Sequence, residues 1–217
     1  MKHIKRMVVP ALIIAILVLA SSCFGVTMDI ALNQNGTGTI SLEYRISKEL
    51  DSLGKLDGNE RWNTVPVGKA DFERSLSRLP EIKLLSFSST EDAKDVIVST
   101  KIAFSNINGL LAFLDASGLR SSFAGDTSSG SLSLTLSDGA KDGTKIDNIN
   151  LSKLIEEAAV SYSVGVGMSL PKEGSLAILD KAGTTIETQK VGKKLSRSFP
   201  LGEVLSSESG IKLIFNW

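Results

Sequence analysis

The sequence predicts an α+β fold, with a mostly antiparallel sheet and two or three amphipathic helices packed on one of its faces. Three observations support this prediction. Segments with alternating apolar and polar residues recur along the chain, which is the pattern of half-buried strands. Other segments repeat apolar residues at helical spacing. Short polar turns separate the alternating segments, as in antiparallel hairpins. In α+β folds of this kind, the helices pack on one face of the sheet.

The chain begins with a leader that has the parts of a secretory signal. Lys2, Lys5 and Arg6 precede an apolar run over residues 7–20, and small residues follow it. At about 1.5 Å per residue this run gives roughly 21 Å of helix, which is shorter than the roughly 30 Å hydrocarbon core of a bilayer. We therefore predict that residues 1–22 are a signal peptide and not a membrane-spanning helix.

Residues 19–23, Leu-Ala-Ser-Ser-Cys, resemble a bacterial lipobox, in which the cysteine receives a diacylglyceryl group and becomes the mature N-terminus. The common form has leucine three residues before the cysteine. Here Leu19 stands four residues before Cys23, which resembles the relaxed lipoboxes of spirochaete lipoproteins. The resemblance implies cleavage between Ser22 and Cys23 and lipid attachment at Cys23. The alternative is a simple signal peptide that leaves a free thiol.

Lipid attachment would place the protein in the cell envelope, anchored to a membrane on its outer or periplasmic face. Each buried methylene contributes about 0.8 kcal/mol, so two or three acyl chains hold a protein where one chain does not. Phe24 follows the cysteine, whereas an aspartate there favours inner-membrane retention in enterobacteria, so delivery to the outer membrane is allowed. The strand pattern starts at Val26 and leaves no stalk, so we expect the domain to sit against the bilayer.

The composition of the mature chain excludes several classes of function. Residues 23–217 have the length of a single domain. They carry 21 Lys and Arg against 24 Asp and Glu, a net charge of about −3, so a basic footprint for nucleic acid is absent. The one histidine is His3, in the leader, and the one cysteine is Cys23. The mature domain therefore lacks the residues for histidine-based catalysis, His or Cys metal sites and haem ligation, and we expect no cofactor.

The first two strands are predicted to form a hairpin. Apolar residues alternate with polar ones from Val26 to Leu32 and again from Ile40 to Ile46. The turn Asn33–Gly36 supplies the positive φ angles that a tight hairpin needs.

The next segments are predicted to alternate between helices and strands. A helix is predicted over residues 69–79, with Phe72 and Leu76 on one face and Pro80 as its stop. The remaining predicted elements are short helical turns over 48–53 and 200–206, loops over 55–68 and 121–130, helices from a cap at Ser105 or Asn106 to Gly118 and over 151–159, and strands over 82–88, 96–104, 132–136, 162–170, 176–179, 185–189, 194–199 and 211–217.

Several patterns that could suggest a site have a simpler structural explanation. Gly165-Val166-Gly167 lacks the third glycine of a dinucleotide fingerprint, and close packing accounts for it better. The loop with Asp138, Asp142 and Asp147 does not have calcium-loop spacing and is predicted to be a solvated turn. Trp62, in a polar loop, could stack on a sugar or enter lipid, but packing on the core is the favoured interpretation.

The mature chain is also similar to a loose class of bacterial envelope lipoproteins that includes the mycobacterial LppM type. The similarity lies in a strand directly after the lipobox cysteine, the hairpin over Asn33–Thr39, a strand closing on Leu170-Pro171, and Ser198–Leu201 before a last apolar strand. The resemblance implies a membrane-tethered α+β domain that binds lipid or glycolipid.

We therefore expect a non-enzymatic, membrane-anchored envelope lipoprotein that binds a lipid, glycan or protein partner at the membrane surface, and no nucleic acid. An alternative is a structural or assembly component of the envelope that presents an exposed sheet edge or the Trp217 strand. A third is a hydrolase that uses carboxylates, such as Glu60 or the Glu156-Glu157 pair, or a Ser-Lys dyad. The sequence identifies no ligand-binding residue.

Overall fold

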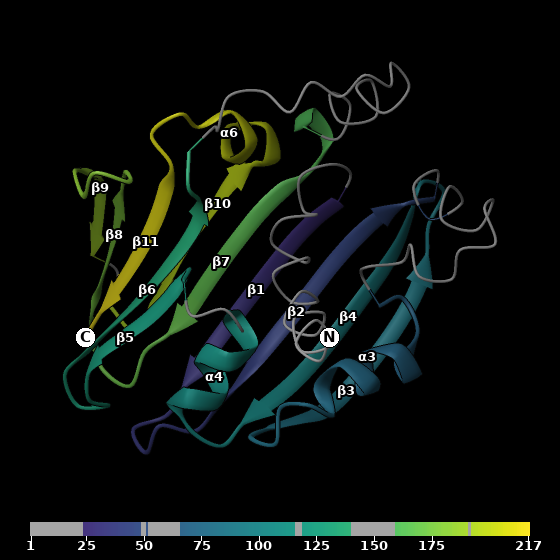
Figure 1. Cartoon of the computed structure of the whole chain (residues 1–217), viewed down its shortest axis with the longest axis horizontal. Coiled ribbons are helices and arrows are strands. Elements are labelled where there is room, and N and C mark those ends of the chain that lie inside the picture. Colours follow the sequence, from purple (N-terminus) through teal and green to yellow (C-terminus); the bar gives the residue numbers. More distant parts are fainter. Residues whose placement is uncertain (1–23, 49–50, 52–65, 116–118, 140–158, 191) are drawn as a thin grey trace, which may run out of the picture.

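The computed structural model describes residues 24–48, 51, 66–115, 119–139, 159–190 and 192–217. Strands dominate these residues and lie in two sheets (Figure 1). The six-stranded sheet contains, in spatial order, β10 (Lys194–Pro200), β7 (Ser163–Ser169), β1 (Phe24–Leu32), β2 (Gly38–Ser47), β4 (Asp95–Phe104) and β3 (Ile82–Glu91). The five-stranded sheet contains β5 (Ser121–Gly125), β6 (Gly130–Ser137), β11 (Ile211–Asn216), β8 (Ser175–Leu179) and β9 (Thr185–Lys190).

The predicted α+β architecture, with helices on one face of a single sheet, is wrong. The described helices are short: α3 (Lys69–Leu76) and α4 (Ile107–Leu114) have eight residues each, and α6 (Leu201–Ser206) has six. The fold is β-rich because the strands form two sheets, each with one apolar face, and much of the core is made by strands. The predicted helix over 151–159 and the turn over 48–53 lie almost wholly outside the described residues.

The predicted hairpin of β1 and β2 is confirmed. The two strands pair antiparallel over their whole length, from Phe24 opposite Ile46 to Leu32 opposite Gly38. In the loop, Gly36 has a φ of 81°, a left-handed conformation that favours glycine. The Asn35 side chain accepts hydrogen bonds from the backbone N–H and the hydroxyl of Thr37, at 3.1 and 2.7 Å. These local contacts fix the loop and therefore the register of the hairpin.

Alternation along the strands divides the six-stranded sheet into an inner apolar face and an outer polar face. The even-numbered residues of β1, β2, β4 and β7 point to the core, and the odd-numbered ones point away from it. β1 pairs with β7 in parallel, while the other pairings of described strands are antiparallel. The outer face carries mostly small side chains. On the inner face, α3 lies on β3 and α4 on β3 and β4, and the five-stranded sheet lies on the β7–β10 side of the larger sheet (Figure 1).

The helices close the core beside and between the sheets. α3 packs on β3, where the rings of Phe72 and Phe87 lie 5.8 Å apart. α4 contacts β3 and β4 of one sheet and β5 of the other. α6 contacts β7 and β10 of the six-stranded sheet and β6 of the five-stranded sheet. One continuous hydrophobic cluster therefore joins the two sheets.

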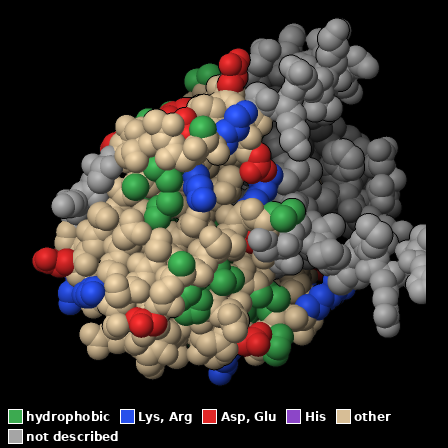
Figure 2. Space-filling model, turned by 60° about the vertical axis from the view of Figure 1, so that its left-hand side comes forward, with side chains coloured by type: hydrophobic (Ala, Val, Ile, Leu, Met, Phe, Trp, Pro, Cys, Tyr) green, Lys and Arg blue, Asp and Glu red, His purple; other side chains and the backbone are tan. Residues whose placement is uncertain are grey.

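The five-stranded sheet corrects two further predictions. Ser121–Gly125 was predicted to lie in a loop, but it forms β5 because its backbone pairs with β6. The C-terminal strand β11 lies between β6 and β8, paired on both sides, so it presents no free edge. Trp217 is only 8% exposed, and its indole N–H donates to the Thr127 carbonyl at 3.1 Å. Figure 2 shows the side of the molecule nearer this sheet, where the described Lys and Arg side chains are interspersed with Asp and Glu.

Candidate functional site

The residues predicted to carry the lipid anchor, Ser22 and Cys23, lie outside the described residues. The described chain starts directly after them. β1 begins at Phe24, one residue after the predicted attachment site and two residues earlier than the sequence pattern indicated. The end of the six-stranded sheet at which β1 starts is therefore the end nearest to Cys23. Among the described residues, no helix is long and apolar enough to cross a membrane.

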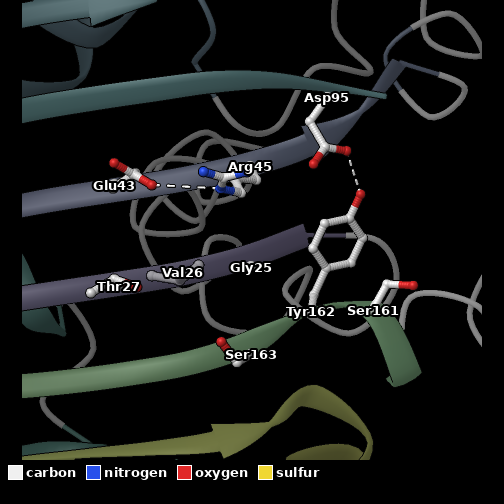
Figure 3. A pocket seen from close by; sticks show the side chains of 9 residues that line it. All are labelled: Gly25, Val26, Thr27, Glu43, Arg45, Asp95, Ser161, Tyr162 and Ser163. Carbon is white, nitrogen blue, oxygen red and sulfur yellow. Dashed lines mark hydrogen bonds and ion pairs between the residues drawn. The ribbon is translucent and has the colours of Figure 1, made fainter. Parts of the chain in front are cut away.

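A polar cavity of about 250 Å³ lies at this end of the sheet (Figure 3). It opens on the outer face, at the start of β1 and β7 and near the end of β2 and the start of β4. We call it the anchor-end notch, and it is lined by Gly25, Val26, Thr27, Glu43, Arg45, Asp95, Ser161, Tyr162 and Ser163. Nearly all of these residues are polar or small.

Asp95 and Tyr162 form one wall of the notch. The Tyr162 hydroxyl donates a hydrogen bond of 2.5 Å to Oδ1 of Asp95, a contact between residues 67 positions apart in the chain. Asp95 is only 7% exposed, although a carboxylate is seldom buried without partners. Figure 3 shows the other carboxylate oxygen of Asp95 on the side that faces Arg45. The wall thus offers an acceptor oxygen held in place by the tyrosine.

Arg45 and Glu43 form the opposite wall, from the outer face of β2. Nε of Arg45 lies 3.5 Å from Oε1 of Glu43, and its Nη1 lies 3.7 Å from Oδ2 of Asp92. The Ser99 hydroxyl donates to Oε2 of Glu43 at 3.3 Å. These side chains are about half exposed, so the ion pairs are weak and leave guanidinium N–H groups free to bind a ligand.

The turn between β3 and β4 supports this wall. Oδ1 of Asp92 accepts hydrogen bonds from the backbone N–H groups of Asp95 and Lys94, at 2.7 and 2.8 Å. These two backbone bonds, with a smaller contribution from Arg45 and Lys48, hold the pKa of Asp92 below its usual range. Asp92 is therefore ionised at neutral pH and remains a partner for Arg45.

Small residues make the space for the notch. A Cβ on Gly25 would stand 3.4 Å from the Tyr162 ring and from the Ser163 carbonyl oxygen, which is an ordinary contact distance, so the Tyr162 ring lies directly over the start of β1. Ser163 and Gly165 continue this low surface on β7, and Thr27 continues it on β1. The notch exists because small side chains lie next to one another on neighbouring strands. No single segment of the sequence shows this arrangement.

The chemistry that the notch can offer is hydrogen bonding. Its lining holds carboxylate and carbonyl acceptors, a guanidinium donor and hydroxyl groups that act as both. The lining contains no lysine, so the Ser-Lys dyad of the third alternative does not form there. Among the described residues, no group of three or more His, Cys, Asp and Glu side chains could hold a metal ion. The arrangement suits a ligand with several hydroxyl groups.

The other residues that the sequence singles out do not join the notch. Gly167 allows close packing, as predicted, because a Cβ there would collide with the Asp29 carboxylate of β1. Asp138 pairs with Arg120 at 2.9 Å, at the surface. The remaining candidates lie outside the described residues: Asp142, Asp147, Trp62, Glu60, Glu156 and Glu157.

A second hollow lies at the far end of the five-stranded sheet, with a volume of about 480 Å³. It is a wide, open depression beside Trp217 and Asn216, with Gly174 and Gly192 on its rim. Its lining includes one charged side chain, Glu173, and fewer converging polar groups than the notch. We therefore take the notch as the candidate site.

Comparison with known proteins finds a similarity in structure and none in sequence. No family model and no curated protein sequence matches this chain. Among solved structures, the chain is similar to the NMR structure of the folded domain of LppM from Mycobacterium tuberculosis, with 12% sequence identity, a TM-score of 0.43 and coverage of 91% of each chain. Nothing in these comparisons supports the spirochaete type of lipobox that the leader resembles.

Proposed function

We propose that this chain is a lipid-anchored protein of the cell envelope that binds a hydroxyl-bearing ligand, the head group of a lipid or a glycan, in the anchor-end notch. The observation that supports the proposal most is the place of the notch. Gly25, which lines it, follows Cys23 by two residues, a span of about 7.6 Å at most at about 3.8 Å per residue. An acyl group on Cys23 would hold the notch at the membrane surface, where lipid head groups and surface glycans are concentrated.

The polar groups of the notch support a ligand with hydroxyl groups more than an apolar one. Asp95 offers an acceptor oxygen in a fixed position. The Tyr162 hydroxyl bonds to one carboxylate oxygen of Asp95, and the other oxygen faces Arg45. Arg45 offers donors in a planar fork. A sugar ring or a polyol head group satisfies both at once through neighbouring hydroxyls, whereas an acyl chain would leave them unpaired at a cost of several kcal/mol in all. We propose binding without catalysis.

Fatty-acid labelling tests the anchor. Cells that express the full chain are grown with an alkyne fatty acid, and the protein is then probed for the label and for release from membranes. We expect label on the native protein and none on the Cys23→Ala variant, which should leave the membrane fraction or accumulate as an unprocessed precursor. Label on Cys23→Ala would refute the anchor.

NMR titration tests the notch. The mature protein in detergent micelles is titrated with methyl glycosides, myo-inositol and glycerol 3-phosphate, and shifts of the Gly25, Tyr162 and Ser163 amides are followed. We expect at least one probe to shift these amides in the native protein and to lose at least tenfold in affinity for Asp95→Asn. The matched control is Asp29→Asn, an exposed aspartate farther along the same face of β1, which should bind as the native protein does. Equal binding by both variants would refute the notch as the site.

A second candidate function is assembly through an exposed edge. β3 is an outer strand of the six-stranded sheet, ten residues long, and most of its side chains are exposed. Such an edge can accept a strand from a partner. Replacing Ser88 and Thr90 with lysine should abolish a crosslinked complex if this edge is used, and should leave sugar binding unchanged.

A further inference from the structure

The side chains that line the anchor-end notch carry more negative than positive charge. Of the described residues in this lining, Glu43 and Asp95 are carboxylates and Arg45 is the one cation, which gives a net charge of −1. The rest of the lining consists of glycine, valine, threonine, serine and tyrosine. A positively charged ligand is therefore attracted to the notch, and an anion is repelled from it.

The turn between β3 and β4, beside the notch, does not supply the missing positive charge. It contains Asp92 and Lys94, and it follows Glu91, whose Oε2 lies 3.1 Å from Nζ of Lys48. These two lysines and two carboxylates have no net charge together. The negative excess of the lining is therefore not offset by these described neighbours.

Asp95 is the carboxylate that most needs a charged partner. It is only 7% exposed, so little water solvates its charge. The Tyr162 hydroxyl donates to its Oδ1, but no ion pair joins Asp95 to any cation that the structure describes. The guanidinium of Arg45 lies 3.5 Å from Glu43 and 3.7 Å from Asp92 instead. The second oxygen of Asp95, on the side of the notch that faces Arg45 (Figure 3), is therefore a buried acceptor without a charged partner among these residues.

An ammonium group matches this arrangement better than a hydroxyl group does. A protonated amine has three N–H donors and a positive charge, whereas a hydroxyl has one donor and no charge. Hydrogen bonds to an ionised partner are roughly twice as strong as those between neutral groups. An ammonium group placed between Asp95 and Glu43 would bond to the second oxygen of Asp95 and would also neutralise the excess charge of the lining.

The size and charge of the notch favour a sugar as the carrier of this ammonium group. Pockets for drug-sized molecules measure about 300–1,000 Å³. The notch, at about 250 Å³, suits a single sugar ring or a short head group. An ethanolamine head group carries its ammonium next to a phosphate, which Glu43 and Asp95 repel. An amino sugar carries its ammonium next to neutral hydroxyl groups.

We infer that the notch binds an amino sugar whose amine is free and protonated, with the ammonium group against Asp95. This inference rests on the proposed binding of a hydroxyl-bearing ligand and names the class of that ligand. The hydroxyl groups of the sugar ring bond to the Arg45 donors and to the hydroxyls of Thr27 and Ser163, which line the same cavity. An N-acetylated sugar is disfavoured, because its amide has no charge and its acetyl group needs more room.

Three sugars that differ at one ring position test the inference. The mature protein in detergent micelles is titrated with methyl 2-amino-2-deoxyglucoside, methyl glucoside and methyl N-acetylglucosaminide, at a pH that keeps the amine protonated. The amides of Gly25, Tyr162 and Ser163 are followed by NMR. We expect the amino sugar to bind about tenfold more tightly than the other two, or better, which is the effect of one hydrogen bond to a charged group.

Charge-removing variants locate the ammonium group. Asp95→Asn retains the shape of the side chain and removes its charge, so the preference for the amino sugar over the glucoside should fall about tenfold. Glu43→Gln should lower the same preference by a smaller factor, and it does not threaten folding because the Glu43 side chain is 47% exposed. Asp29→Asn is the matched control, because it removes an exposed carboxylate outside the lining, and it should keep the full preference.

The outcomes separate this inference from the proposed function. Equal binding of the three sugars, or binding of glycerol 3-phosphate without the amino sugar, refutes the ammonium group while the binding of a hydroxyl-bearing ligand stands. Tighter binding of glycerophosphoethanolamine than of the amino sugar overturns the choice of a sugar. A preference for the amine that persists in both Asp95→Asn and Glu43→Gln shows that the ammonium group binds elsewhere. If none of these probes and no polyol shifts the notch amides, the inference and the proposed function both fail.

Discussion

At the scale of single residues, a buried polar group on the inner face of β4 is a defect in the core. Thr100 is only 5% exposed, and its hydroxyl has no hydrogen-bond partner among the residues that the structure describes. An unpaired buried hydroxyl costs about 1–3 kcal/mol, so replacing it with a methyl group of the same shape removes that cost. We expect Thr100→Val to raise the free energy of unfolding by about 1 kcal/mol. Urea titration measures it, with exposed Thr90→Val as the control, expected within about 0.5 kcal/mol of the native protein. A destabilised Thr100→Val protein would show that the hydroxyl has a partner.

A second prediction at this scale concerns Asp92, in the turn beside the notch. The backbone N–H groups of Asp95 and Lys94 stabilise its ionised form, so its pKa in the folded protein lies below the unfolded value of about 3.9. Linkage gives the sign: this stabilisation is present above the unfolded pKa and is lost as the pH falls through the lower pKa of the folded state. NMR titration of the Asp92 carboxyl carbon should therefore give a midpoint below about 3.9. The Asp92→Asn variant should lose part of the acid dependence of unfolding, and a midpoint at or above the ordinary value would contradict both expectations.

At the scale of elements, local signals predicted most strands and the two longer described helices. The β1–β2 hairpin is explained by alternation and by Asn33–Gly36, and α3 and α4 are explained by apolar spacing and by the capping residue Asn106. Pairing between distant segments has no such signal. β1 pairs in parallel with β7, which lies far away in the chain. Ser121–Gly125 has the composition of a polar loop and forms a strand because it pairs with β6.

The notch was not predicted for the same physical reason. Arg45, Asp95 and Tyr162 each look like an ordinary polar residue near the end of a strand. Only the sheet order brings them to one cavity, because β2, β1 and β7 are neighbours in space and β4 adjoins β2. The sequence did contain one usable signal, the strand that begins directly after Cys23, which predicted that this end of the domain lies near the anchor.

The cap of α4 gives a prediction at the element scale. Oδ1 of Asn106 accepts from the backbone N–H of Gly109 at 2.8 Å, which satisfies one of the free donors at the helix start. We expect Asn106→Ala to lower the free energy of unfolding by about 1 kcal/mol. Asn106→Asp should retain most of the stability that the cap contributes, because aspartate is also a good N-cap residue. Asn108→Ala, at an exposed position inside the same helix, is the control and should be neutral or slightly stabilising. Thermal unfolding distinguishes them, and equal effects of the two alanine variants would show that the cap contributes nothing.

At the scale of the whole molecule, the two sheets should unfold as one unit. α4 and α6 each contact both sheets, and Arg197 of β10 pairs with Glu187 of β9 at 3.0 Å. Leu110 of α4 is fully buried in the shared core, so Leu110→Ala should lower the free energy of unfolding by about 2–5 kcal/mol. Because the core is continuous, hydrogen exchange should show the slowest amides of β2 and of β11 losing protection by the same amount. Leu85 is exposed on β3, so Leu85→Ala should leave the free energy of unfolding and the protection of these amides unchanged. If only one sheet lost protection in Leu110→Ala, the predicted single domain of residues 23–217 would have to be divided into two.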